Sequence, residues 1–182
     1  MKTANEQAAD ALPADHGSWV IRLATPMDAT GVARILNQVI TDGRHSLLDT
    51  PYSDEEERAY IQNLAPRGFI HVAESPAGEI AALQTIEPYA GFATGAFEHV
   101  ATMGTWVREA HRRRGLGRRL CAAGFALARR QGFTKVFTDI RADNLESVAF
   151  HRALGFNIVG TAPRLARLGG SYVDVVFVER DV

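Results

Sequence analysis

Apolar residues recur with a helical period in two segments near the start of the chain. In TPMDATGVARILNQVI they fall three and four residues apart, which predicts a helix from Asp28 to Ile40. A second helix is expected over DEEERAYIQNL, residues 54–64. Ser53 precedes it as an N-cap, and acidic residues fill its first turn, where the helix dipole favours negative charge.

Runs rich in β-branched and aromatic residues predict strands in the rest of the chain. They are SWVIRLAT at 18–25, FIHVAES at 69–75, EIAALQTIEP at 79–88, a run from about His99 to Val107, KVFTDI at 135–140, FNIVGTA at 156–162 and YVDVVFVER at 172–180. The turn PAG joins the second and third runs as a hairpin. KVFTDI is a largely apolar run, which is typical of a sheet interior.

Two further helices are expected in the second half of the chain. Apolar spacing predicts the first from about Gly115 to Arg130. The second covers DNLESVAFHRAL, residues 143–154, with Asp143 and Glu146 as an expected capping box and Gly155 as its C-terminal stop. The resulting order is mixed α/β, with a strand–helix–strand unit at its centre.

The length and composition of the chain predict one globular domain. With 182 residues, 46% of them hydrophobic, the chain can bury a substantial core. Residues 1–17 are polar and are expected to form a flexible tail before a domain at 18–182. The net charge of −1 gives no basic excess, so no nucleic-acid partner is expected. One cysteine, no signal-peptide pattern and no apolar run of membrane-spanning length together predict a cytoplasmic protein without a membrane partner.

The stretch HRRRGLGRRL, His111 to Leu120, places five arginines around two glycines at the start of a predicted helix. Free N–H groups at a helix start and the helix dipole attract anions, and glycines let a phosphate approach the backbone. The pattern Arg-x-x-Gly-x-Gly is neither a P-loop nor the dinucleotide-binding Gly-x-Gly-x-x-Gly. These residues alone support a phosphate site and a solvated basic turn about equally.

A second segment, DNLESVAFHRALGF, carries a polar stripe. Asn144, Ser147 and His151 fall at i, i+3 and i+7 and so share one helical face. Such a stripe on a helix packed among buried strands predicts a polar partner. Taken in isolation, an exposed face with a chance histidine explains it better.

Together the two segments resemble the GNAT acetyltransferase superfamily. WVREAHRRRGLGRRL matches the cofactor motif of that superfamily, and NLESVAFHRALGF matches its second motif, an Asn followed by a helix and Gly-Phe. The order of elements over most of residues 18–182 is also similar to that fold. Within the superfamily, SVAFHRALGF, IRLATPMDATGVARILNQVI and YVDVVFVERDV are most similar to the phosphinothricin and amino-acid N-acyltransferase branch.

The resemblance implies a mixed central sheet, flanked by helices and splayed between the strand ending near Val107 and the KVFTDI strand. Acetyl-CoA would lie in that split as a co-substrate, and no metal is expected, because the histidines form no ligand-spaced pair. The residues that the resemblance assigns to acetyl-CoA are the backbone groups of Trp106 and Val107, the turn residues Arg112, Arg113, Arg114, Gly115, Leu116, Gly117 and Arg118, and Asn144 on the pantetheine arm.

The reaction implied is direct acetyl transfer from a thioester to a primary amine. The amine must lose a proton to attack, and the leaving thiolate benefits from gaining one. Many relatives donate that proton from a tyrosine; here His151 holds the position and is expected to be the general acid or a proton relay. Many members of the branch carry a glutamate base where this chain has Thr102. We therefore expect a water-mediated base, with Glu98 as the carboxylate candidate and with His99 and Glu87 nearby in sequence.

The acceptor is expected to be a small-molecule amine, and an arginine beside it would suit an amino acid or analogue. Residues expected to line the acceptor site are Arg44, His45, Tyr52, Tyr89, Phe92 and Arg164. A protein N-terminal or lysine acetyltransferase and a non-catalytic acyl-CoA-binding regulatory module remain alternatives. Cys121 is expected in the core rather than as a nucleophile. Dimers are common in the superfamily, which allows a homodimer.

Overall fold

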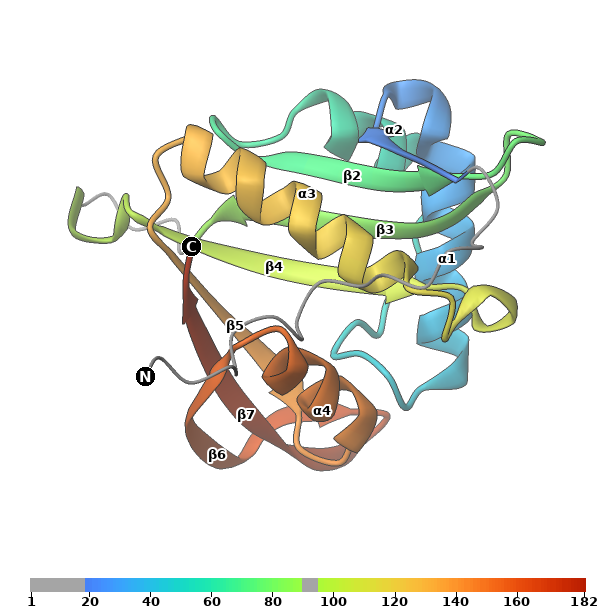
Figure 1. The fold of residues 1–182 in the computed structure, drawn as a ribbon. Helices are drawn as coiled ribbons and strands as arrows, with labels where there is room; N and C mark the ends of the chain where they lie inside the picture. The colour runs from blue at the N-terminus through green and yellow to red at the C-terminus, as the bar shows by residue number, and fades with distance from the viewer. Residues whose placement is uncertain (1–18, 90–94) are drawn as a thin grey trace, which may run out of the picture.

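The computed structural model describes residues 19–89 and 95–182, and within them seven strands form one sheet in the order β1-β2-β3-β4-β5-β7-β6 (Figure 1). The strands are β1 Val20–Leu23, β2 Phe69–Glu74, β3 Ile80–Pro88, β4 Val100–Val107, β5 Lys135–Arg141, β6 Asn157–Leu168 and β7 Ser171–Asp181. The α-helices are α1 Ala29–Asp42, α2 Asp54–Gln62, α3 Leu116–Arg130 and α4 Leu145–Ala153. The predicted element order is confirmed, and the predicted N-terminal tail lies outside the described residues.

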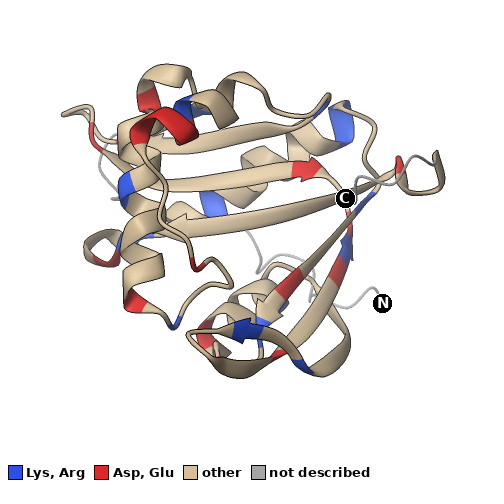
Figure 2. Ribbon diagram, turned by 180° about the vertical axis from the view of Figure 1, so that it is seen from behind, with Lys and Arg blue, Asp and Glu red and all other residues tan. Residues whose placement is uncertain are grey.

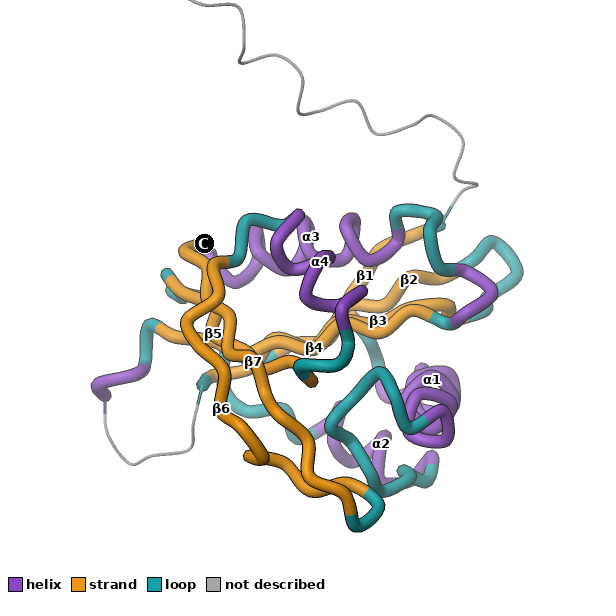
Figure 3. Tube along the Cα trace, turned by 90° about the horizontal axis from the view of Figure 1, so that it is seen from below, coloured by secondary structure: helices purple, strands orange, loops and turns teal. Residues whose placement is uncertain are grey.

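The sheet opens between β4 and β5. These two strands are parallel and pair only at Val100 with Lys135 and at Ala101 with Val136, whereas the other neighbouring strands are antiparallel. Beyond Ala101 the two strands diverge, as Figures 1 and 3 show. The Thr138 hydroxyl donates a hydrogen bond of 2.8 Å to the carbonyl of Met103 across the base of this opening. The predicted splayed sheet is therefore confirmed.

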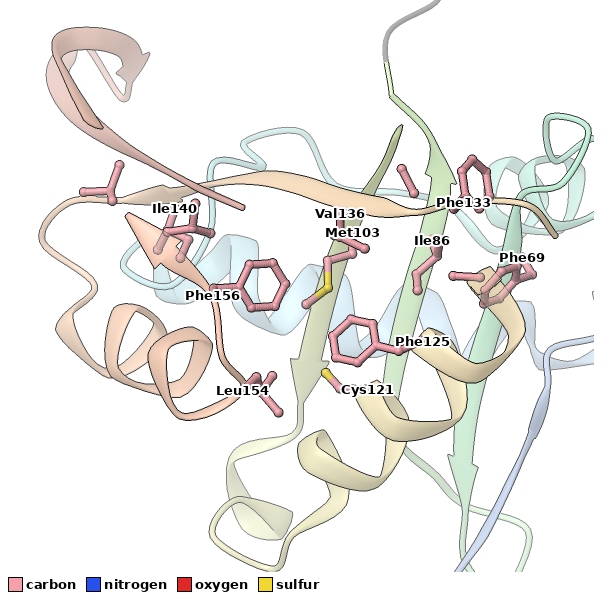
Figure 4. Close-up of a cluster of buried hydrophobic side chains, with 14 residues drawn as sticks. Phe69, Ile86, Met103, Cys121, Phe125, Phe133, Val136, Ile140, Leu154 and Phe156 are labelled. Carbon is pink, nitrogen blue, oxygen red and sulfur yellow. The ribbon is translucent and has the colours of Figure 1, made fainter. Parts of the chain in front are cut away.

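Helices cover both faces of the sheet, with α1 and α2 on one side and α3 and α4 on the other (Figure 3). On the α3 side, Cys121 and Phe125 of the helix pack against Met103 and neighbouring strand residues in one core cluster (Figure 4). Leu120 is fully buried, and burying a leucine side chain contributes about 1.5–3 kcal/mol. This packing holds the start of α3 firmly beside the end of β4.

The two predicted helix starts have different outcomes. At α2 the predicted N-cap Ser53 is confirmed, because its hydroxyl accepts from the Glu56 N–H at 3.2 Å. The Glu56 carboxylate also accepts from the Ser53 N–H at 2.8 Å, which completes a capping box. At α4 the predicted box of Asp143 and Glu146 is wrong. Asn144 is the N-cap, because its side chain accepts from the Ser147 N–H at 3.1 Å. Arg141, a strand residue, binds Asp143 instead.

The hairpin of β6 and β7 is longer than expected. The sequence predicts the sixth strand to end at Ala162, before Pro163, but β6 continues to Leu168. The register with β7 shifts between Ala162 and Ala166, which is how a sheet accommodates a proline that cannot donate to the ladder.

Figure 2 shows basic and acidic residues interspersed along the ribbon. The first turn of α2 is acidic. Across residues 19–89 and 95–182, no helix combines the length and apolar character needed to cross a membrane.

Candidate active site

Two adjoining cavities occupy the opening between β4 and β5. The first, which we call the turn pocket, has a volume of about 520 Å³ and is lined by the end of β4, the turn before α3 and the first half of α4. The second, the split pocket, has a volume of about 280 Å³ and is lined by β4, β5, the α1–α2 loop and α4. His45, Thr105, Trp106 and Ser147 line both cavities, so they form one continuous cleft.

The turn before α3 has the backbone geometry of an anion site. Gly115 is the N-cap with φ 75°, and Arg113 also has a positive φ of 62°. A left-handed arginine costs about 1 kcal/mol or more, so the surrounding structure must hold this turn in place. The first helical backbone bond runs from the Arg119 N–H to the Gly115 carbonyl at 3.0 Å. The three N–H groups before it, at residues 116–118, therefore have no acceptor within the helix and are free for an anion.

The predicted turn residues do not all act in the same way. Arg113 and Arg118 are exposed and line the turn pocket, whereas Arg114 is exposed but does not line it. Arg112 lines the pocket and also donates from Nε to the Val107 carbonyl at 3.2 Å, which fastens the turn to the end of β4. The Leu116 side chain is buried in the core, so this residue offers the pocket only its backbone.

Gly117 lies where the turn, β4 and α4 approach one another. A Cβ atom at this position would lie 3.2 Å from Cζ of Phe150 and 3.7 Å from Cγ2 of Val107. The first distance is shorter than an ordinary van der Waals contact, so any larger side chain would narrow the pocket mouth. The absence of a side chain keeps the free N–H groups accessible to a ligand.

The β4 backbone offers hydrogen-bonding groups to the cleft, but not at Trp106. The Arg108 N–H donates to the Ala81 carbonyl at 2.9 Å, and Trp106 lies opposite Leu83 on β3. Backbone groups alternate in direction along an antiparallel ladder, so those of Trp106 face β3, whereas those of Thr105 and Val107 face the opening. The backbone groups available at the opening are therefore those of Thr105 and Val107 rather than those of Trp106, and sequence reasoning missed Thr105.

The Trp106 side chain is nonetheless part of the cleft. Its indole ring lies over Gly104, where an added Cβ would come within 2.0 Å of the ring. It packs with the hydrophobic cluster under α1 and α2 and lines both pockets. Only glycine at residue 104 leaves room for this wall of the cleft.

Asn144 connects α4 to the α1–α2 loop. Besides capping the helix, its side chain donates from Nδ2 to the His45 carbonyl at 3.2 Å. Arg141 donates from Nη1 to the Gly43 carbonyl at 2.7 Å, in the same loop. Asn144 lines the turn pocket as expected, but its side chain already bonds to the protein, so it positions His45 at the cleft.

His151 lines the split pocket and is buried. Its Nδ1 lies 2.8 Å from the Ser147 carbonyl oxygen, which can only accept, so Nδ1 carries the proton and Nε2 does not. Burial lowers the pKa of His151 below its ordinary value, which favours the neutral ring at neutral pH. A neutral ring with a bare Nε2 suits a proton relay and leaves little imidazolium to act as a general acid.

The carboxylate candidate Glu98 is not brought to the cleft. The sequence interpretation assumed that the strand alternation extends through this residue, but β4 begins at Val100 and Glu98 lies in an exposed turn. It lines neither pocket, while Thr102 lines the split pocket. Glu87 lies opposite Thr102 on β3, but it accepts a hydrogen bond from Tyr60 and lines neither pocket.

The carboxylate that does line the split pocket is Asp139 on β5. It is the only acidic residue among the described residues that line this cavity. Its side chain is accessible to solvent, and partial enclosure by the cleft walls raises its pKa above the ordinary value. Sequence reasoning missed Asp139, although a charged residue inside the otherwise apolar run KVFTDI was a visible signal.

Of the residues expected to bind the acceptor, His45 lines both pockets. Arg44, Tyr52, Tyr89 and Arg164 line neither, and Phe92 lies outside the described residues. The guanidinium of Arg164 stacks on the Tyr172 ring at 4.4 Å instead.

Cys121 is fully buried, and burial raises the pKa of its thiol to about 11. Its predicted place in the core is confirmed. The described ranges contain no group of three or more His, Cys, Asp or Glu residues that could hold a metal ion.

Comparison with known proteins gives the cleft a context. The model of the acetyltransferase (GNAT) family matches residues 36–156. An L-methionine sulfoximine/L-methionine sulfone acetyltransferase of Pseudomonas aeruginosa is 31% identical, over 87% of this chain and 92% of that protein.

Solved structures share the fold. A GNAT superfamily phosphinothricin acetyltransferase of Sinorhizobium meliloti, determined with acetyl-CoA bound, superposes with a TM-score of 0.82 at 20% identity, covering 91% of this chain and 89% of that one. A ribosomal-protein-alanine N-acetyltransferase of Brucella melitensis has a TM-score of 0.82 at 25% identity, covering 90% of this chain and 99% of that one.

Proposed function

This chain belongs to the GNAT acetyltransferase family, and we propose that it transfers the acetyl group of acetyl-CoA to the primary amine of a small amino acid or amino-acid analogue. The observation that carries the proposal is the continuous cleft. It joins free helix N–H groups at one end to ionisable side chains between two diverging strands at the other.

The turn pocket fits the pyrophosphate of acetyl-CoA. The unpartnered N–H groups of residues 116–118 and the guanidinium groups of Arg113 and Arg118 offer donors for an anion. The backbone groups of Thr105 and Val107 would hold the pantetheine arm, and the thioester would then lie beside the split pocket. Gly117, which has no side chain, leaves these N–H groups accessible from the turn pocket.

When bound, acetyl-CoA supplies the thioester carbonyl that the amine attacks. His151, with a bare Nε2, would accept a proton released during the attack and pass it toward the departing sulfur. The Trp106 ring would shield this end of the cleft from bulk water.

The acceptor class rests on the relatives and on pocket size. The Pseudomonas aeruginosa relative is named for two analogues of methionine, and the split pocket, at about 280 Å³, has room for a molecule of that size. A lone buried thiol also suits a reducing compartment, and we place the reaction in the cytoplasm.

A thiol-release assay tests the proposal. The protein is incubated with acetyl-CoA and a panel of L-methionine sulfoximine, L-methionine sulfone, free amino acids and an alanine-terminated peptide. We expect release of coenzyme A with the small amines. Turnover with the peptide alone would identify a protein N-terminal acetyltransferase. Tight coenzyme A binding without any turnover would identify a non-catalytic acyl-CoA-binding module.

A further inference from the structure

We infer that Asp139 binds the ammonium group of the acceptor and takes its proton, in place of the glutamate that this chain lacks at Thr102. The inference rests on the proposed function and deepens it, because it names the chemical group by which the split pocket selects its substrate.

The register of the sheet places Asp139 across the opening from the middle of β4. Val100 pairs with Lys135 in parallel, so continued pairing would set Asp139 beside Gly104. The strands have separated before this point, so Asp139 borders the cavity on its β4 side, while on its other side it pairs with Phe177 of β7.

Asp139 also lies on the same side of the sheet as Thr102. Along β5, Val136 and Ile140 point into the core under α3, so Asp139 points to the opposite face. Along β4, Trp106 packs under α1 and α2, and Thr102 shares its face by alternation. This chain thus carries its carboxylate on β5 rather than on β4, on the face of the sheet that α1 and α2 cover.

The charges around the split pocket leave Asp139 uncompensated. The ionisable residues that line this cavity with it are His45 from the α1–α2 loop, Arg141 from β5 and His151 from α4. The Arg141 guanidinium is held by both carboxylate oxygens of Asp143 and by the Gly43 carbonyl. No ion pair within the described residues involves Asp139, and the pocket is therefore electrostatically suited to a cation.

Asp139 and His151 account for both protons that leave the ammonium group. The acceptor ammonium gives one proton to the Asp139 carboxylate, which is accessible enough to release it to solvent. The neutral amine then forms the C–N bond, the C–S bond breaks, and the sulfur leaves as a thiolate. The second proton of the amine passes through Nε2 of His151 to the thiolate. Amine acetylation thus yields the amide, free coenzyme A and one solvent proton.

Kinetics of Asp139→Asn test the inference, with L-methionine sulfone as the acceptor. We expect kcat/KM to fall at least 100-fold while the Kd for coenzyme A stays within twofold, because the amide cannot accept the proton. Asp139→Glu should recover part of the loss. Asp181→Asn is the matched control: this carboxylate is exposed, pairs with Lys135 and lines neither pocket, so its kcat/KM should equal that of wild type.

A binding measurement separates this inference from the proposed function. Wild-type protein saturated with coenzyme A should bind L-methionine sulfone at least tenfold more tightly than the 2-hydroxy acid with the same side chain. Asp139→Asn should lose that preference. If wild type shows the preference without any turnover, the proposed function fails and the ammonium site stands. The inference would be overturned if Asp139→Asn kept its kcat/KM within threefold of wild type. It would also be overturned if kcat/KM fell 100-fold in Glu87→Gln but not in Asp139→Asn, or if wild type showed no preference for the amine.

Discussion

The turn pocket and the split pocket are halves of one cleft, but they are built in different ways. The turn pocket uses backbone groups from one contiguous turn, and most side chains there are exposed or directed elsewhere. The split pocket uses side chains from the α1–α2 loop, β4, β5 and α4, which meet only because the sheet opens. A ligand site made of local backbone tolerates change in its side chains, whereas a site made of converging side chains depends on each of them.

Gly117→Glu should have the largest effect, because the new side chain would enter the turn pocket, where backbone groups make the site. The new side chain would meet Phe150 and place a negative charge at the proposed pyrophosphate site. We expect the affinity for coenzyme A, measured calorimetrically, to fall more than 100-fold, or about 3 kcal/mol. Gly160→Glu, where nothing lies within 4 Å of an added Cβ, is the matched control and should bind normally. Normal binding by Gly117→Glu as well would mean that the anion site lies elsewhere.

His151→Ala should lower kcat about 100-fold at neutral pH, because it removes the proposed proton relay from the split pocket. The affinity for coenzyme A should not change. The pKa of His151 lies below its ordinary 6.5. Protonation in wild type therefore sets in below that pH and removes the lone pair on Nε2. The ratio of wild-type to variant kcat should shrink as the pH falls through this range. An unchanged kcat at every pH would exclude His151 from the chemistry.

Glu57→Gln should change stability without affecting either pocket. Glu57 is buried, and desolvation raises its pKa from 4.5 to about 7. A raised native pKa stabilises the fold below pH 4.5, and that contribution is lost as the pH rises through about 7. We expect Glu57→Gln to exceed wild type in free energy of unfolding by roughly 1–3 kcal/mol at pH 8, with little difference at pH 4.5. Urea titrations at both pH values measure this, and equal stabilities at pH 8 would contradict it.

Substitutions of Asn144 should have the smallest effect. They test the hydrogen bond that joins α4 to His45, a residue that lines both pockets. Asn144→Asp keeps the cap acceptor but loses the N–H that holds the His45 carbonyl, so we expect a few-fold rise in KM for the amine at near-normal stability. Asn144→Ala should show the same rise and also lose about 1 kcal/mol of stability with the cap. Thermal unfolding and steady-state kinetics of both variants measure the two effects. Matching stabilities for the two variants would argue against the capping role.

The sequence predicts features that depend on neighbours along the chain. The Ser53 cap, the apolar spacing of α3 and the glycine that starts this helix all follow from local patterns, and the structure confirms them. The prediction failed where a tertiary partner competes. Asp143 is a plausible cap in sequence, but Arg141 binds it and Asn144 takes its place.

The carboxylate of the site shows the limit most clearly. The alternation that favours Glu98 ends at the start of β4, whereas Asp139 lies in the mainly apolar strand β5, whose pattern predicts only a sheet interior. Which carboxylate reaches the cavity depends on where two strands separate, and no local pattern records that separation.

The sequence by itself determined the family, the order of elements and the glycine that starts α3, because each depends on residues close together in the chain. The tertiary structure decided which side chains meet in the split pocket, how Arg141 is compensated and which ring nitrogen of His151 is bare. The physical reason is that periodicity and capping are local energies, whereas burial, charge compensation and access to a cavity arise only when distant segments pack together.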